Sequence, residues 1–367
     1  MKPTAKDESK EPWNALDWGR VPPQFFTPSP DRTAALLSLV QTAPPGPHPP
    51  ANFFRTVEMS AREEAFVVAC FLGAGAATLS IPCFAIWLAL AGYGAGLVTL
   101  GCIVAGLVLH PLPILPALHH SYFVRCLLKY FSFTCVWRGP RDLVRHSATT
   151  SPWIGYGVPH GAFPFGNVLC VAAIQLLGIP FVGTSADVVL RVPVLRWLAM
   201  LGVVSASKPS VIAHATRGIN VGLVPDGIAG IFKLEQDREV VAVADRRGAA
   251  RLALEHGITI HPGYLLGNTA CYHVWHDSSG VLETISRRLR VSLMLFWGRW
   301  GLPVPFRTRI SFVFGTPVVP PRPPTPGGPP SKEAVEAVHR MVLAEVRRVY
   351  EEAAPPFGWN GRPLVFV

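Results

Sequence analysis

The stretch WIGYGVPHGAFPFGNVLCVAAIQLLG, residues 153–178, joins a short apolar run, a turn rich in glycine and proline, and a longer apolar run. The first run, WIGYGV, predicts a strand, and NVLCVAAIQLLG predicts a helix that ends at Gly178. A strand followed closely by a helix is the repeating unit of α/β domains. Within the turn, His160 stands between a proline and a glycine.

The same alternation continues through most of the chain after about Arg138. Further strands are predicted at INVGLVP (219–225), ITIHPGYLL (258–266) and RISFVFG (309–315). Further helices are predicted at 192–202, 207–218, 246–257 and 331–354. These elements predict an α/β domain with a mostly parallel sheet flanked by helices.

A long uncharged segment precedes this domain. From Ala65 to Val124 there is no Asp, Glu, Lys or Arg. Residues 65–91, with a kink expected at Pro82, and residues 95–115 are each long enough for a bilayer span, which needs roughly 20 apolar residues. A buried helix pair is the alternative, but soluble cores rarely extend so far without charge. We therefore expect an N-terminal transmembrane helical hairpin.

The flanks of this segment predict its orientation. Basic residues lie on both sides of it, and two spans return the chain to its starting side, so both termini are expected in the cytosol. The 64 polar, proline-bearing residues ahead of it argue against a signal peptide. The chain is thus divided into a flexible cytosolic tail (1–64), a membrane-embedded hairpin (65–124), an α/β domain (125–320), and a proline linker with an amphipathic helix and C-terminal tail (321–367).

Composition narrows the class of partner. Half of the 367 residues are hydrophobic and only 15% are charged, against about a quarter in ordinary soluble domains. The net charge is +10, and residues 285–310 contain six arginines and no acid, interleaved with aromatic residues. Such a segment suits an anionic lipid surface or a phosphate-bearing ligand. Nucleic acid is the competing partner, and the membrane hairpin argues against it.

The seven cysteines include no C-x-x-C pair. We therefore expect neither a disulfide framework nor a metal site, and this usage fits a reducing compartment.

Three turns that follow predicted strands carry candidate functional residues, because sites gather where strand ends meet helix starts. His160 is either a water-exposed turn residue or a general base near neutral pH. Asp226 is either part of a plain turn or a carboxylate that orients an imidazole or binds a hydroxyl. Arg246 and Arg247 are either a solvated helix start or a grip on phosphate groups. His261, in a buried-looking strand, is expected to be structural.

The order of these motifs resembles the diacylglycerol acyltransferase family of the type-2 kind, which includes monoacylglycerol and wax-alcohol acyltransferases. The resemblance covers about residues 125–319, and its most specific part is the block RRGAARLALEHGITIHPGYLLGN (246–268). It implies transfer of an acyl group from acyl-CoA to diacylglycerol or a related lipid alcohol. The expected surroundings are the endoplasmic reticulum membrane and the lipid droplet surface, with acyl-CoA as co-substrate and no cofactor.

The resemblance also implies roles for single residues. His160 is expected to be the general base, with Gly161 and Asp226 beside it in the catalytic site. Arg246, Arg247 and Gly248 are expected to bind the phosphates of acyl-CoA. Because there is no G-x-S-x-G nucleophile elbow, direct transfer is favoured over an acyl-enzyme.

Several positions depart from the family pattern. Val158 replaces the first histidine of the usual HPHG block, and Gly230 replaces the glutamate of PGG..E. The usual FGEN becomes LGNT at residues 266–269, and Phe165 stands where glycerophosphate acyltransferases carry an acid. The acceptor therefore stays open between diacylglycerol, monoacylglycerol and a long-chain alcohol. A non-catalytic lipid-droplet or acyl-CoA-binding protein, and a homo-oligomer, also stay open.

Overall fold

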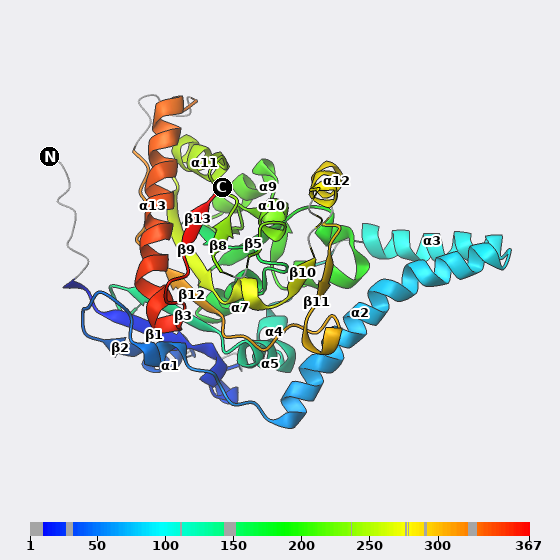
Figure 1. Cartoon of the computed structure of the whole chain (residues 1–367), viewed down its shortest axis with the longest axis horizontal. Helices are drawn as coiled ribbons and strands as arrows, with labels where there is room; N and C mark the ends of the chain where they lie inside the picture. Colours follow the sequence, from blue (N-terminus) through cyan, green and yellow to red (C-terminus); the bar gives the residue numbers. More distant parts are fainter. Residues whose placement is uncertain are drawn as a thin grey trace.

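A nine-stranded sheet is the centre of the computed structural model, which describes residues 10–26, 32–110, 112–142, 152–235, 237–275, 277, 279–289, 292–321 and 329–367 (Figure 1). In spatial order its strands are β2 (Gln41–Ala43), β1 (Trp13–Asp17), β3 (Thr134–Arg138), β12 (Ser311–Phe314), β9 (Thr259–Leu266), β4 (Trp153–Val158), β7 (Asn220–Leu223), β5 (Phe181–Ser185) and β6 (Val203–Ser205). Two small sheets join β8 (Glu239–Val241) to β13 (Leu364–Phe366) and β10 (His273–Trp275) to β11 (Leu295–Trp297).

The directions of the strands make this a mixed sheet rather than the mostly parallel sheet that we predicted. The half formed by β9, β4, β7, β5 and β6 is parallel throughout. In the other half, β12 runs antiparallel to β9 and parallel to β3, while β1 runs antiparallel to β3 and β2. Two of the antiparallel pairings involve β1 and β2, which come from the N-terminal segment for which no strand was predicted, and the third joins the predicted strands β12 and β9.

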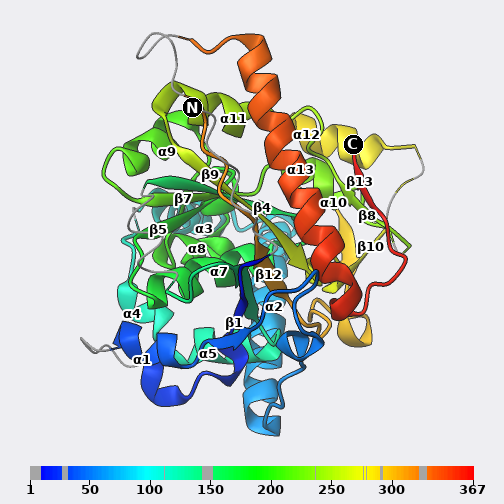
Figure 2. The ribbon, with the colours of Figure 1, turned by 90° about the vertical axis from the view of Figure 1, so that its left-hand side faces the viewer.

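Helices cover both faces of the sheet. The α-helices of the described residues, which include two that extend away from the sheet, are α1 (Arg32–Ser38), α2 (Ala61–Leu90), α3 (Gly94–Leu109), α4 (Pro116–His119), α5 (Tyr122–Tyr130), α7 (Phe165–Leu176), α8 (Trp197–Met200), α9 (Lys208–Ala215), α10 (Gly227–Ile231), α11 (Gly248–His256), α12 (Val281–Leu289) and α13 (Lys332–Phe357). One core packs α5 and α7 against the sheet, and a second core packs α9, α11 and α13 against the opposite face. Figure 2 shows α13 lying across that second face.

The stripe of valines along α13 explains why this helix binds the sheet. Val335, Val338, Val342, Val346 and Val349 recur at helical spacing and are all buried. Each buried valine contributes roughly 1.5–3 kcal/mol relative to an exposed one. Ser331 caps the helix, since its hydroxyl accepts a hydrogen bond from the backbone of Ala334 at 3.1 Å.

The predicted helix at residues 192–202 is wrong in its first half. The chain forms two single turns of 3₁₀ helix, η5 (Val189–Arg191) and η6 (Pro193–Leu195), before the short α8. Pro193 is the physical reason, because a proline disfavours helical backbone in the residue before it. Val192 is accordingly extended, with φ −74° and ψ 117°.

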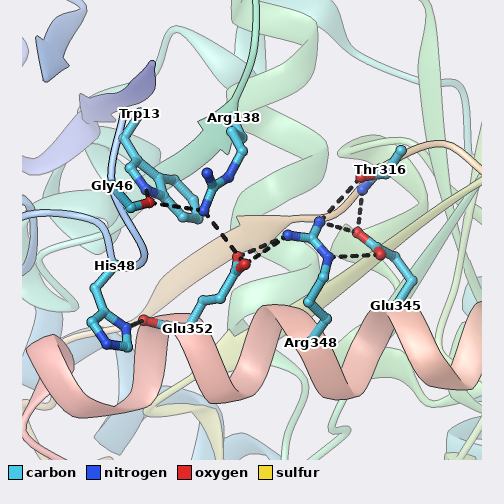
Figure 3. Close-up of polar contacts among 8 residues, drawn as sticks. All are labelled: Trp13, Gly46, His48, Arg138, Thr316, Glu345, Arg348 and Glu352. Carbon is cyan, nitrogen blue, oxygen red and sulfur yellow. Dashed lines mark hydrogen bonds and ion pairs between the residues drawn. The ribbon is translucent and has the colours of Figure 1, made fainter. Parts of the chain in front are cut away.

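The N-terminal segment is part of the domain, so the prediction of a flexible tail over residues 1–64 is wrong for its described part. Trp13 and Leu16 are buried, and β1 pairs with β3 along five residues. Figure 3 shows the contacts that fix this segment: Trp13 Nε1 and Arg138 both donate to the carbonyl of Gly46, at 3.0 and 3.1 Å. Arg138 also pairs with Glu352 of α13 at 3.4 Å.

The uncharged segment forms two helices that extend away from the body of the protein (Figure 1). Helix α2 begins at Ala61 after a capping box made by Ser60 and Glu63, and it continues through Pro82 to Leu90. Among the described residues it is the one helix long and apolar enough to cross a membrane, and only 6% of its most apolar window is buried. Helix α3 follows after a short turn and has 16 residues.

Candidate functional site

The candidate site lies where three parallel strands end at the same edge of the sheet. His160 follows β4, Asp226 follows β7 and Asn268 follows β9. The backbone N–H of His160 donates to Asp226 Oδ2 at 2.7 Å, and Asn268 Nδ2 donates to the carbonyl of His160 at 2.7 Å. The turns that follow the predicted strands at residues 153–158, 219–225 and 258–266 therefore meet at one place.

Asn268 ties the His160 turn together. Asn268 is fully buried, and it is the first residue of the short η7 helix (Asn268–Ala270). Besides His160, Nδ2 donates to the carbonyl of Pro159 at 3.1 Å, and Oδ1 accepts from the backbone N–H of Gly166 at 2.9 Å. Sequence reasoning noted this position only as the loss of an acid. The available signal was an amide, which both donates and accepts, directly after a buried strand and a glycine.

Gly161 allows this close packing. Its φ of +67° lies in the left-handed region, and a Cβ built on it would lie 2.8 Å from the carbonyl oxygen of Asn268. Only glycine meets both requirements without displacing the backbone. The space left by the missing side chain is thus taken up by Asn268 on this side of the turn.

The imidazole of His160 has a defined tautomer in its neutral form. Nδ1 lies 2.8 Å from the carbonyl oxygen of Gly161. A carbonyl can only accept a hydrogen bond, so Nδ1 carries the proton and Nε2 retains the lone pair. The residue is only half-buried.

Asp226 holds the main chain of His160 rather than its ring. The carboxylate is fully buried, and Oδ1 has no hydrogen-bond partner within the described part of the chain. Burial raises the pKa of Asp226, and this effect is partly offset by the charge of His160 and by backbone N–H groups. The sequence left open that this carboxylate orients the imidazole. In the structure it accepts a hydrogen bond from the backbone N–H of His160 instead.

Gly230 provides the room for Asp226. A Cβ at Gly230, in α10, would lie 2.4 Å from Asp226 Oδ2. A carboxylate at position 226 in this conformation therefore excludes any side chain at position 230. The two departures from the family pattern, an acid gained at 226 and an acid lost at 230, are physically coupled.

The two arginines before α11 have different surroundings. Arg247 Nε lies 2.5 Å from Glu336 Oε2, and its Nη1 lies 3.1 Å from Asp245. Arg246 is exposed. Burial raises the pKa of Tyr156, the charge of Asp226 raises it further, and the charge of Arg246 partly offsets this, so Arg246 acts electrostatically on the same part of the site as Asp226. Gly248 is the first residue of α11.

A buried carboxylate contacts the residue that follows Asn268. Glu239, in β8, accepts hydrogen bonds from Tyr264 at 2.8 Å and from Thr269 at 3.0 Å, and it pairs with Arg362 at 2.5 Å. Burial is the largest influence on the pKa of Glu239 and raises it. Thr269 adjoins Asn268, so the C-terminal segment is linked to the site through this ion pair.

The two remaining candidate positions, His261 and Phe165, pack against aromatic rings in the interior. His261 is buried in β9 and stacks on Trp153, with ring centroids 4.7 Å apart. Phe165, in the place of an acid, stacks on Phe131 at 4.7 Å. Within the described residues there is no group of three His, Cys, Asp or Glu side chains that could hold a metal ion.

Comparison with known proteins gives the family. The family model described as diacylglycerol acyltransferase matches residues 142–366. The chain is 25% identical over 262 residues to human acyl-CoA wax alcohol acyltransferase 1, covering 63% of this chain and 77% of that protein. It is 24% identical over 246 residues to diacylglycerol O-acyltransferase 1 of Eremothecium gossypii, covering 61% of this chain and 52% of that protein.

A third relative is diacylglycerol O-acyltransferase 2 of Bos taurus, 25% identical over 254 residues, with 61% of this chain and 68% of that protein covered. The chain thus spans between about half and three quarters of the length of these relatives. No solved structure matches the chain significantly. The family model covers more than half of the chain, and the resemblance found in the motifs is confirmed. The chain belongs to the diacylglycerol acyltransferase family.

Proposed function

We propose that the protein transfers a fatty acyl group from acyl-CoA to diacylglycerol, with His160 as the general base. Family membership supports the reaction class. The observation that carries the role of His160 is its tautomer: Nδ1 is engaged by the carbonyl of Gly161, and Nε2 is left as the basic nitrogen at the end of a buried strand.

The proposed reaction is a direct transfer. His160 Nε2 takes the proton of the acceptor hydroxyl as its oxygen attacks the thioester carbon. The tetrahedral oxyanion then collapses, the carbon–sulfur bond breaks, and the CoA thiolate takes the proton from the imidazolium. Backbone N–H groups around Gly161 are our candidates for stabilising the oxyanion. Asp226 and Asn268 serve as positioning residues, because they contact the main chain of His160.

Binding of acyl-CoA is assigned to the start of α11. Arg246, Arg247 and Gly248 would hold the phosphate groups, with the helix N-terminus adding favourable backbone dipoles. Arg246 is the more available of the two arginines, since Arg247 already pairs with Glu336 and Asp245. Acyl-CoA acts as a co-substrate, and we propose no further cofactor.

The membrane part of the proposal rests on α2 and α3. The 16 residues of α3 extend about 24 Å at 1.5 Å per residue, less than the roughly 30 Å of bilayer hydrocarbon. We therefore propose that α2 and α3 enter the membrane of the endoplasmic reticulum and return, with both termini in the cytosol. Glycosylation tags at either end should stay unmodified, and modification of either tag would contradict this topology.

A long-chain alcohol is the second candidate acceptor. The human relative acts, by its name, on wax alcohols, and it is 25% identical over 63% of this chain. Monoacylglycerol differs from diacylglycerol by one acyl chain and is the third acceptor to compare.

The acceptor is tested with the purified protein and labelled oleoyl-CoA, offered each alcohol separately. Triacylglycerol is the expected main product, formed by the wild type and formed at least about 10²-fold more slowly by His160→Ala. Wax ester as the main product would replace the proposed acceptor. Binding of acyl-CoA without any product would overturn the proposed activity in favour of a lipid-binding protein.

A further inference from the structure

Exposed large apolar side chains are concentrated in two segments of the described chain. One set lies between Leu72 and Leu115, in and just after α2 and α3, and the other lies between Trp275 and Leu302. Elsewhere in the part of the chain that the structure describes, only Tyr122, Val319, Met341 and Val367 are as exposed. Because a large exposed apolar surface marks a place of contact with another molecule, the second segment needs a partner that covers it.

We call the described residues of the second segment, together with the strand that leads into it, the 275–302 surface. It comprises β10, β11, the single 3₁₀ turn η8 (Arg299–Gly301) and α12. Its most exposed apolar side chains include Trp275, Val281, Leu295, Trp297, Trp300 and Leu302, and the exposed fractions reach 64% for Leu295 and 65% for Trp300. Tryptophans gather at membrane–water interfaces because the ring is apolar and its N–H is polar.

Contacts with α2 place this surface beside the helix that we propose enters the membrane. Arg299, in η8, pairs with Glu64 near the start of α2 at 2.5 Å. Further along α2, a Cβ built on Gly75 would lie 2.8 Å from Pro303. Figure 1 shows β10, β11 and α12 on the side of the body from which α2 and α3 extend.

The same surface is connected to the candidate site. Tyr272, which directly precedes β10, packs on Phe296 at 4.9 Å and on Phe165 at 5.9 Å between ring centroids. Phe165 starts the helix that follows the His160 turn. In the chain, β10 begins five residues after Asn268, the side chain that holds this turn.

We propose that the 275–302 surface lies in the lipid–water interface as a second membrane contact, beside the site where α2 leaves the body. Exposed Arg288 on α12 gives the surface a basic residue that suits anionic lipid headgroups. The consequence is that the catalytic turn faces the bilayer, so an acceptor dissolved in the membrane reaches His160 without crossing water. This role for the catalytic turn rests on the proposed function.

The membrane contact can be tested on the full-length chain without measuring catalysis. In a background with Cys70, Cys83 and Cys102 replaced by Ala, single cysteines are introduced as Leu295→Cys and Trp300→Cys and are labelled with an environment-sensitive fluorophore. Met341→Cys, on α13, is the matched control, because Met341 is 52% exposed. The protein is reconstituted in vesicles of phosphatidylcholine and phosphatidylserine that contain nitroxide lipids. A separate sample keeps Cys83 in α2 as its single labelled residue.

Labels at 295 and 300 should shift to the blue and be quenched more by a nitroxide near the headgroup than by one deep in the acyl chain. The label at 341 should show the emission of water and little quenching, and the label at Cys83 should be quenched. Labels at 295 and 300 that behave like the label at 341 would overturn the proposal. A blue shift without nitroxide quenching would do the same, since it indicates cover by protein, such as a second copy.

Acyl transfer by unlabelled protein separates this inference from the proposed function. Turnover without quenching at 295 and 300 would remove the second membrane contact and leave the activity. Quenching without turnover would leave the contact and remove the activity. In kinetics, Leu295→Asp combined with Trp300→Asp should raise the KM for the membrane-dissolved acceptor at least several-fold while the KM for acyl-CoA changes little. Met341→Asp should change neither, and an equal rise in both KM values for the double variant would count against the surface.

Discussion

Replacing Gly161 with Ala probes how closely the His160 turn is packed. The added methyl group would lie 2.8 Å from the carbonyl oxygen of Asn268 and 3.0 Å from its Nδ2. It would also place a side chain on a residue with φ +67°. Both effects act on the residue whose carbonyl engages His160 Nδ1.

The expected magnitudes follow from these contacts. Left-handed backbone costs a non-glycine residue roughly 1–2 kcal/mol. Relief of the contact with Asn268 requires a displacement of about half an ångström or more, because ordinary van der Waals contact begins near 3.4 Å. A misplacement of about 1 Å in an active site can cost about 10²-fold in rate. We therefore expect Gly161→Ala to lower kcat by roughly 10- to 100-fold.

A matched glycine separates backbone strain from the contact. Gly257, after α11, has φ +65°, and a Cβ added there would meet nothing within 4 Å. Gly257→Ala should therefore lose a similar 1–2 kcal/mol of stability and keep its kcat. Unfolding in detergent and initial rates with oleoyl-CoA would be measured for both variants. A Gly161→Ala enzyme that keeps kcat within about twofold, with the stability of Gly257→Ala, would refute the reasoning.

Substitutions at Asp226, at Asp17 in β1 and at the two arginines before α11 give three further tests. Asp226→Asn keeps an acceptor for the backbone of His160 and should retain kcat within a few-fold, whereas Asp226→Ala should lose more than tenfold. Burial raises the pKa of Asp226, so above pH ~4 the folded protein binds more protons at this residue than the unfolded protein does. The stability of the wild type therefore falls as pH rises from there, and Asp226→Asn should gain stability relative to it. Burial likewise raises the pKa of Asp17 from 3.8 to about 6, so wild-type stability should fall by at most about 3 kcal/mol across that window, and Asp17→Asn should flatten this part of the pH profile. Arg246→Ala should raise the KM for acyl-CoA more than Arg247→Ala, because Arg247 is already ion-paired; equal effects would return both residues to a solvated helix start.

Several elements were predicted correctly because their sequence pattern depends only on neighbouring residues. The strand at residues 153–158, the helix ending at Gly257 and the amphipathic helix after the proline linker all depend on nearby residues, and the structure contains each of them. That the turns of His160, Asp226 and Asn268 would lie together was predictable for the same reason, since strand ends in a parallel sheet share one edge.

The error at residues 192–202 is local and comes from Pro193, whereas the other features that the sequence did not predict depend on contacts between distant residues. The strand Trp13–Asp17 is stabilised by β3, more than a hundred residues later, and by Arg138 beside Gly46. A composition rich in proline and charge carries no sign of this pairing, because strand formation depends strongly on tertiary context. Nor could the sequence show that Asn268 bridges the His160 turn, which follows from a buried position reached only in the folded sheet.

The most direct test of the central claim is the kcat of His160→Ala beside that of His214→Ala. His214, in α9, is a matched control because its Nδ1 also lies 2.8 Å from a backbone carbonyl, that of Ser210, away from the three strand ends. If His160 is the general base, its removal should lower kcat by about 10²-fold or more, with protein level and membrane insertion unchanged, while His214→Ala keeps the wild-type rate. A His160→Ala enzyme that retains most of its turnover would contradict the account.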